Sequence, residues 1–385
     1  MNITNVAKLL ELKESELTEF CETDPYNNQE VKGYISRRSD HRYGALLIYE
    51  VNGFITRPQI IYCTPKLYYP FGKDQDEQRS YTFPKINRVY VYNKLDGTNI
   101  CRYTYRNHLD ELFVSFKTRL TPFLRQSKFG DFYSLWNEVL ELYPEIKNLG
   151  KNYGTYSMSF EMYGYRNPHL ISYDVALDAR LLFLVDKTTA EILPPVNDPV
   201  LERINNKIVL TITSRDDLIA SYQKLRRQAQ LDNKVCDDGT IQGTEGFVFY
   251  TYSVEEDWNM YKCKPEMIEE IHWANNSISY HSIVTTILNS LENRDTIDNE
   301  FVVQLLKEEY SEQQIHNSDI RIRKAIEAVQ EKIDLTTKVK EAFQSYGLSS
   351  FFSKSDIMRT LSSSFSKSDM RKIFTILREL NLIKE

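Results

Sequence analysis

The feature that most constrains the fold is a single change in hydrophobic patterning near Pro265 of the 385-residue chain. Before it, apolar and polar residues mostly alternate, which is typical of half-buried strands. After it, apolar residues recur at helical spacing. The segments with this spacing are 267–289, 300–310 and 320–346. The pattern predicts an α+β fold, with one domain over 1–266 and an all-helical domain over 267–385. No Gly/Ser linker separates them, so we expect the two parts to pack together.

Within the first domain, residues 1–85 are read as an N-terminal elaboration. A helix is predicted for Asn5–Cys21, a second over 131–143 before Pro144, and a third after Ser214 as N-cap. The remaining segments alternate as strands do. Strands are expected at 45–49, 54–56, 59–62, 89–92, 101–105, 112–117, 156–163, 180–186, 246–250 and 260–264. Two short helices close the chain, each preceded by Ser-Lys-Ser-Asp.

Composition limits the classes of partner. The net charge of -6 excludes a strongly basic body, so a nucleic-acid site has to be a local patch. The five cysteines form no Cys-x-x-Cys pair, which argues against a zinc site or a disulfide framework. No apolar run approaches the ~18 residues of a membrane span, and the N-terminus does not resemble a signal peptide. We expect a soluble cytoplasmic protein without a membrane partner.

One lysine stands where a strand is interrupted by a turn. The alternating run Val89–Asn93 leads into Lys94-Leu95-Asp96-Gly97, and strand-forming residues resume at Thr98. This lysine is either a solvated residue beside an Asp-Gly turn or a covalent nucleophile. A lysine attacks only as a neutral amine, and desolvation or nearby positive charge lowers the usual lysine pKa of ~10.4.

Two acids and two further lysines lie on later strands. Glu161 interrupts an apolar strand, and Glu245 precedes another. Lys262 and Lys264 alternate on one strand, so both side chains leave the same face. They are either solvent-facing lysines of an edge strand or ligands of a shared anion. Two acids with three lysines favour a metal–phosphate site, because Mg²⁺ prefers carboxylate and phosphate oxygens.

The order of these segments resembles the covalent nucleotidyltransferase superfamily of polynucleotide ligases and mRNA capping enzymes. The motifs are Lys94-Leu95-Asp96-Gly97, Phe160-Glu161, Glu245-Gly246-Phe247-Val248 and Lys262-Cys263-Lys264. The resemblance covers about residues 35–266, and implies an antiparallel-sheet, ATP-grasp-like ligase domain. Members that act on DNA or cap mRNA carry a β-barrel after the last motif, whereas this chain has a helical pattern there. It is therefore most similar to the RNA ligases, including bacteriophage RNA-repair ligases.

This resemblance implies a role for each matching residue. Lys94 would form a covalent lysyl-AMP with ATP, and the AMP would pass to a 5′-phosphate RNA end before a 3′-hydroxyl displaces it. Glu245 would bind Mg²⁺ (or Mn²⁺), Lys262 and Lys264 would contact the α-phosphate, and Arg119 would contact the AMP or a substrate phosphate. The remaining nucleotide-binding positions implied are Asp96, Gly97, Asn99, Glu161, Phe183 as the aromatic stacked on adenine, and Lys66 as a pyrophosphate contact.

Other functions stay open at this point. A DNA ligase or a capping-type guanylyltransferase would share the same motifs, and a non-catalytic RNA-binding protein would keep only the scaffold. The RNA ends, the host-cell cytoplasm of a phage-encoded enzyme, and a monomeric state are expectations that follow from the resemblance. Basic residues after Arg321 are interleaved with acidic ones, which is typical of solvated helix faces.

Overall fold

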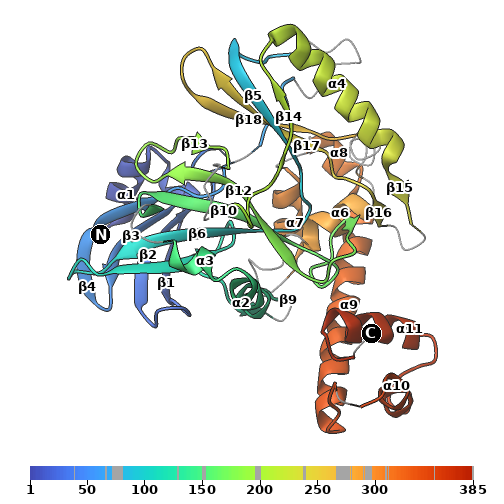
Figure 1. Ribbon diagram of the computed structural model, residues 1–385. Coiled ribbons are helices and arrows are strands. Elements are labelled where there is room, and N and C mark those ends of the chain that lie inside the picture. Colours follow the sequence, from blue (N-terminus) through green and yellow to red (C-terminus); the bar gives the residue numbers. More distant parts are fainter. Residues whose placement is uncertain are drawn as a thin grey trace.

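A computed structural model describes most of the chain (Figure 1). The described residues are all except 39, 66, 72–80, 128–129, 150–152, 196–200, 237–239, 266–277, 279, 289, 291–296, 308–309, 311, 351 and 384–385.

The N-terminal part is a four-stranded antiparallel sheet in the order β1-β2-β3-β4. Its strands are Leu17–Thr23, Glu30–Ser36, Leu46–Val51 and Phe54–Ile61. Helix α1 (Ile3–Leu10) precedes them, followed by a 3-10 turn at Glu14–Glu16. The prediction of one helix from Asn5 to Cys21 is therefore wrong. The backbone of Glu11 turns left-handed and ends the helix, and the residues after 16 pair with β2 over seven positions.

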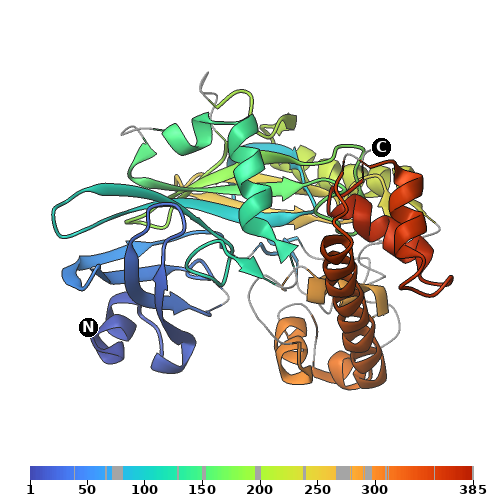
Figure 2. The same ribbon diagram turned by 90° about the horizontal axis from the view of Figure 1, so that it is seen from below.

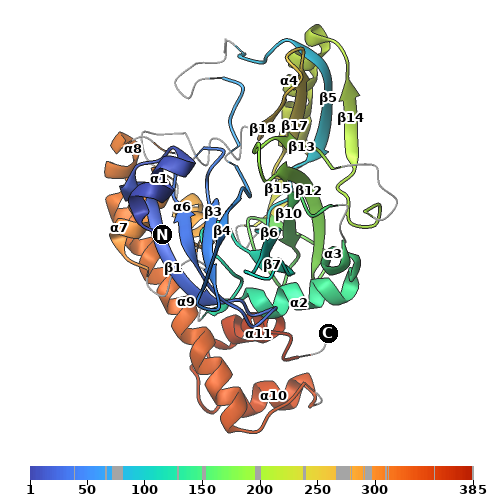
Figure 3. The same ribbon diagram turned by 90° about the vertical axis from the view of Figure 1, so that its left-hand side faces the viewer.

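A five-stranded sheet, in the order β13-β12-β10-β6-β7, forms the middle of the molecule. Its strands are β6 (Thr98–Arg106), β7 (Leu112–Lys117), β10 (Tyr156–Tyr163), β12 (Asp178–Asp186) and β13 (Ile192–Leu193). Helices α2 (Phe132–Leu142) and α3 (Glu145–Asn148) cover one face, where Trp136 packs on Phe116 and Phe160 in a buried core. The other face packs in part on the N-terminal sheet, through Tyr103 and Tyr105, and in part on a second sheet (Figure 3).

That second sheet has the order β14-β5-β17-β18. Its strands are β5 (Ile86–Asn93), β14 (Ile208–Ile212), β17 (Phe247–Ser253) and β18 (Trp258–Cys263). Helix α4 (Arg215–Asp232) covers its outer face through Leu218 and Tyr222 (Figure 1). Tyr92, Phe183 and Val248 belong to a core between this sheet and the five-stranded one. The two sheets thus bring residues from distant parts of the chain to one junction.

Short strands connect these sheets. β8 (Gln126–Ser127) pairs with β9 (Gly130–Asp131). A three-stranded sheet, in the order β11-β16-β15, lies beside the end of β10, and its β11–β16 pair is parallel. Its strands are β11 (Ile171–Ser172), β16 (Ile241–Gln242) and β15 (Lys234–Val235).

Beyond residue 277, every described element is a helix. They are α6 (Tyr280–Leu288), α7 (Asn299–Leu306), α8 (Glu312–His316), α9 (Asp319–Ser345), α10 (Lys354–Leu361) and α11 (Met370–Glu379). The 27-residue α9 joins two separate cores, because its first half packs with α6 and α7 and its second half with α10 and α11 (Figure 2). Ser353 caps α10 by accepting from the backbone N–H of Asp356, as the Ser-Lys-Ser-Asp pattern predicts.

The architecture is a mixed α/β fold with mainly antiparallel sheets, which agrees with the predicted class. The domain boundary predicted at 266 falls outside the described residues, which leave out 266–277. Arg378 of α11 lies 5.7 Å from the ring of Tyr165, so the helical region contacts the loop after β10. Over the described residues, no helix is both long and apolar enough to cross a membrane.

Candidate active site

Lys94 lies directly after β5, where the second sheet meets the middle one. Its backbone N–H donates to the carbonyl of Gly246 at 2.8 Å, which fixes it beside the start of β17. Its ammonium forms an ion pair with Glu245, and the side chain is 20% exposed. The lysine is thus held by a carboxylate at the sheet junction, and is not the solvated residue of an ordinary hairpin turn.

Glu245 bridges two lysines. One carboxylate oxygen is paired with Lys94, and the other lies 3.0 Å from the ammonium of Lys264. Burial of Glu245 opposes its ionisation, but the charges and hydrogen bonds of the two lysines outweigh burial and lower its pKa to about 2. Glu245 is therefore an ionised carboxylate at neutral pH, with a cation on each side.

Glu161 contacts the turn after Lys94 from the adjacent strand. The backbone N–H of Gly97 donates to Oε1 of Glu161 at 3.1 Å, and Asn99 donates to Oε2 at 3.4 Å. A Cβ at position 97 would lie 2.1 Å from the carbonyl oxygen of Met162, so only glycine fits this close approach. Burial raises the pKa of Glu161 to about 7, although the positive charge of Lys94 opposes the shift.

Two residues that the sequence did not reveal position Asn99. The hydroxyl of Thr64 donates to Asn99 Oδ1 at 2.5 Å and lies 3.0 Å from the hydroxyl of Ser159. Asn99 Nδ2 donates in turn to Ser159 at 2.9 Å and to the carbonyl of Phe160 at 3.1 Å. Ser159 and Glu161 alternate on one strand, so their shared face was readable. Thr64, which follows β4, had no such pattern.

Asp96 has a different environment from its neighbours. Its carboxylate accepts from the backbone N–H of Ile171 at 2.8 Å, and its own N–H donates to the Tyr173 hydroxyl at 2.8 Å. Burial and then the nearby charge of Glu245 raise its pKa. The geometry shows Asp96 fastening the turn to the β11 segment, while its predicted nucleotide contact stays a prediction.

Lys262 and Lys264 are both buried, at 8% and 7% exposed. The alternative of two solvent-facing lysines is therefore wrong. Cys263, between them, belongs to the core under α4, so the lysines leave the opposite face of the strand. The ammonium of Lys262 lies 4.5 Å from the centre of the Tyr69 ring, a cation–π contact.

Three other predicted residues lie further from this group. Phe183 is 3% exposed, pairs with Ser159 across β12 and β10, and lies in the core between the sheets. The Arg119 guanidinium lies 5.2 Å from the Tyr43 ring, and within the described residues it forms no ion pair. Their predicted contacts with AMP stay predictions. Lys66 lies outside the described residues.

The donor set fits a hard divalent cation only in part. Over the described residues, no group of three or more His, Cys, Asp or Glu side chains could hold a metal ion. Glu245 is an ionised carboxylate of the kind that Mg²⁺ or Mn²⁺ binds through one or two protein oxygens plus phosphate and water. The residues present therefore suit a cation that is brought in with a phosphate ligand, not one held by the protein alone.

Comparisons with known proteins give remote structural likenesses. No family model matches the sequence, and no curated protein matches it. Among solved structures, an archaeal ATP-dependent RNA ligase is 12% identical with a TM-score of 0.46, covering 88% of this chain and 82% of that one. An RNA ligase of Naegleria gruberi, solved with PPi, is 11% identical with a TM-score of 0.35, covering 67% and 98%. At these similarities, any assignment of function rests on the site itself.

Proposed function

We propose that this protein is an ATP-dependent RNA ligase that joins 5′-phosphate and 3′-hydroxyl RNA ends. The observation that supports the proposal most directly is the carboxylate of Glu245 bridging Lys94 and Lys264, with Glu161 at the adjoining turn. These residues come from positions 94 to 264 of the chain, and each matches a motif of the covalent nucleotidyltransferases. A purely structural cluster would not need that order.

In the proposed first step, Lys94 Nζ gives up a proton to solvent and attacks the α-phosphorus of ATP as a neutral amine, a P–N bond forms, and pyrophosphate leaves with the electron pair of the broken P–O bond. The 5′-phosphate of an RNA end then displaces the lysine and takes the AMP. A 3′-hydroxyl then loses its proton to solvent and attacks the phosphorus of the RNA 5′-phosphate, which forms the phosphodiester and releases AMP as the leaving group. In-line displacement at phosphorus depends mainly on positioning and charge neutralisation. Lys262 and Lys264 provide the positive charge here.

The remaining roles are assigned to the groups that surround Lys94. Glu161 holds the ribose, supported by Asn99 and the backbone of Gly97. Asp96 keeps the turn in place, Phe183 and Lys66 contribute to base and pyrophosphate binding, and Arg119 contacts a phosphate. Glu245 is the residue that would hold Mg²⁺ or Mn²⁺, and such an ion neutralises the charge of the phosphates.

The assignment of RNA, and not DNA, as the substrate polymer is based on the helical region. The described residues after 277 form helices only, in place of the barrel that the resemblance predicts for DNA ligases and capping enzymes. In this proposal, residues 267–385 determine substrate specificity. The protein acts as a monomer in RNA repair in the cytoplasm. A non-catalytic RNA-binding protein is the alternative from another class, and it would have no use for Glu245 between the half-buried Lys94 and the buried Lys264.

Labelling with radioactive nucleotide tests the proposal. The protein is incubated with α-labelled ATP or GTP and Mg²⁺, then denatured, and label that stays on the protein is counted. We expect stable label from ATP, none in Lys94→Ala, and wild-type label in Lys85→Ala, which removes an exposed lysine near the start of the same strand.

Absence of label from both nucleotides contradicts the enzyme assignment, and label from GTP alone indicates a capping-type enzyme. Ligation of 5′-phosphorylated RNA against DNA then assigns the polymer. Sealing of DNA alone contradicts the RNA ligase.

A further inference from the structure

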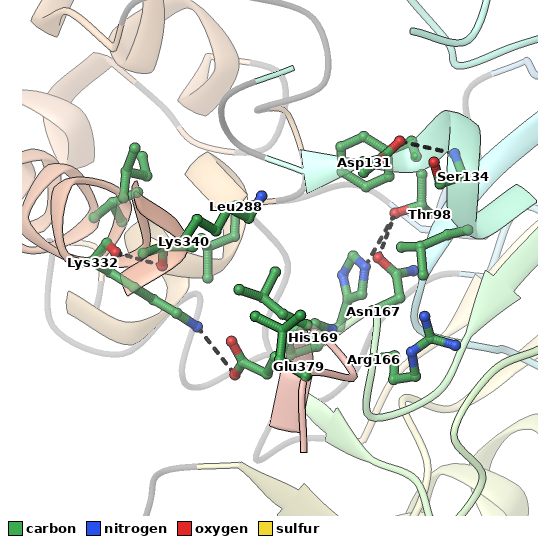
Figure 4. Close-up of a pocket in the computed structure, with 18 of the residues that line it drawn as sticks. Thr98, Asp131, Ser134, Arg166, Asn167, His169, Leu288, Lys332, Lys340 and Glu379 are labelled. Atoms are coloured by element: carbon green, nitrogen blue, oxygen red, sulfur yellow. Dashed lines mark hydrogen bonds and ion pairs between the residues drawn. The ribbon is translucent and has the colours of Figure 1, made fainter. Parts of the chain in front are cut away.

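A cavity of about 740 Å³ lies between the middle sheet and the helical region. Thr98, Asn167 and His169 line it on the sheet side, and Lys332 and Lys340 of α9 line it on the other side (Figure 4). Thr336 of α9 also lines it. Ligand sites in proteins commonly enclose ~300–1,000 Å³, so the space suits a ligand of nucleotide size. None of the residues assigned to the proposed ATP site lines it.

The cavity walls include an apolar surface. Leu135 of α2, Leu288 of α6 and Phe343 of α9 contribute to it from three different helices. An aromatic ring such as that of Phe343 stacks on any nucleobase, because every base has a π-face, and the leucines add apolar contact area. One part of the cavity therefore suits a base.

Two of the cations in the lining are paired with acids, and Lys340 is the one for which the described residues supply no counter-charge. The guanidinium of Arg166 is paired with Glu138, at 2.5 and 2.9 Å, and Lys332 lies 3.4 Å from Glu379. The Lys340 side chain is half-buried at the cavity wall. Over the described residues, its ammonium forms no ion pair or hydrogen bond.

The acid not accounted for by these pairs is Asp131, whose carboxylate caps α2 by accepting from the N–H of Ser134 at 2.9 Å. Within the part of the chain that the structure describes, the Lys340 ammonium is thus available to a phosphate, a group that lysine side chains commonly contact in nucleic acids.

The cavity is connected to the turn that carries Lys94. The hydroxyl of Thr98 donates to Asn167 Oδ1 at 3.2 Å and lies 3.4 Å from His169 Nε2. Thr98 and Asn99 are adjacent on β6, so their side chains leave opposite faces of the sheet. Asn99 contacts Glu161, and Thr98 therefore lies on the reverse side of the turn. A ligand in the cavity lies behind the reacting groups and not among them.

We propose that this cavity binds one nucleotide of the RNA strand, away from the ends that are joined, with its phosphate on Lys340 and its base against the apolar wall. The proposal rests on the proposed function. The lining residues Lys332 and Gln344 are exposed, so the cavity is open to solvent along α9. An RNA strand needs such an opening, because the nucleotides on either side of the bound one have to lie outside the cavity. The cavity thus anchors the strand through both parts of the protein.

Binding of a single-stranded RNA 10-mer, measured by fluorescence anisotropy without ATP at several salt concentrations, tests the proposal. Lys340→Ser is compared with Lys338→Ser, an exposed lysine two positions away that points to a different side of α9. We expect Lys340→Ser to weaken binding about tenfold and to reduce the slope of log K against log salt by about 0.7, the contribution of one phosphate on a single strand. Lys338→Ser should leave both values near wild type.

A second pair of variants tests the space itself. Thr336→Trp fills the cavity, whereas Thr337→Trp places the same ring on an exposed neighbouring position. We expect RNA binding to fall in the first variant only. Competition with AMP separates the two sources of a nucleotide. If AMP displaces the RNA at micromolar concentration, a free mononucleotide is the ligand and the proposal is overturned.

Labelling of Lys94 by ATP separates this proposal from the proposed function. We expect Lys340→Ser and Thr336→Trp to label as wild type does, because the cavity lies behind the turn. If wild type labels and binds RNA, but neither variant loses RNA affinity, the cavity proposal fails while the ligase assignment stands. If wild type does not label, the ligase assignment fails, and RNA binding that still depends on Lys340 would leave the cavity as the site of an RNA-binding protein.

Discussion

The two acids of the candidate site differ in their environments. Glu245 lies between two ammonium groups, and its pKa is lowered to about 2. Glu161 accepts hydrogen bonds from a backbone N–H and an amide, and burial raises its pKa to about 7. Neutral donors do not compensate for desolvation as two cations do. Glu245 therefore stays ionised at neutral pH, whereas Glu161 changes its protonation near neutral pH.

Removing the charge of Glu245 should have the largest effect on this difference between the two acids. In Glu245→Gln, the ammonium groups of Lys94 and Lys264 lose their shared carboxylate. We expect a loss of roughly 3 kcal/mol in the free energy of unfolding, as for other buried ion pairs that lose one partner. Urea denaturation at pH 7 measures this loss, with the exposed Glu255→Gln as the matched control. Equal stability of the two variants would contradict the buried bridge.

For Glu161 we expect the contribution to the free energy of unfolding to change with pH in the direction opposite to that of Glu245. Its pKa in the folded state, about 7, lies above the ~4.3 of an unfolded glutamate, so the folded protein holds an extra proton between these values. The contribution of Glu161 to stability is therefore greatest below pH 4 and is lost as the pH rises through 7. Relative to wild type, Glu161→Gln should gain stability by roughly 3 kcal/mol between pH 4 and pH 8.

Denaturation of both Gln variants across pH 3–8 compares the two acids directly. For Glu245 the folded pKa lies below the unfolded one, so its contribution is present above pH ~4.3 and is lost as the pH falls toward 2. The difference between wild type and Glu245→Gln should thus shrink below pH ~4.3, whereas the difference for Glu161→Gln changes in the other direction between pH ~4.3 and 7. Parallel curves for the two variants would refute the contrast.

Lys264→Gln sharpens the comparison, because it removes one of the two cations beside Glu245 and leaves Lys94. We expect a loss of about 1.5–3 kcal/mol in the free energy of unfolding, the range for a hydrogen bond to a charged group. The acid limb of the stability curve should move to higher pH, since the pKa of Glu245 is no longer lowered by both lysines. The control is Lys224→Gln on the exposed side of α4, which should change neither. An unchanged acid limb in Lys264→Gln would show that Lys94 alone holds Glu245 ionised.

The sequence predicted most of this region because its signals are local. The alternation through β5, β10, β17 and β18 is regular, and a lysine followed by Asp-Gly defines the turn. Residues 5–21 were predicted as one helix because apolar residues recur there at helical spacing, yet pairing of β1 with β2 overrides that local preference.

The side-chain partners were less predictable. Nothing in the sequence indicates that Asp96 contacts Ile171, 75 positions away, while Glu161 contacts Gly97. Thr64 has the least signal, since a threonine between Cys63 and Pro65 has no periodicity, and its contacts with Asn99 and Ser159 exist only after the N-terminal part has packed on β6 and β10. Contacts of this kind depend on tertiary packing and not on local pattern.

Thr64 therefore offers the smallest and most specific test. Thr64→Val keeps the shape of the side chain but removes the hydroxyl that donates to Asn99, which leaves a half-buried amide oxygen without that donor. We expect a loss of about 1 kcal/mol in stability and, because Asn99 then holds Glu161 less firmly, weaker ATP binding in the labelling reaction. Thr64→Ser restores the donor and should restore the apparent KM for ATP. If Val and Ser variants label at the same ATP concentration, Thr64 only packs the site, and Glu161 is positioned by the Gly97 backbone alone.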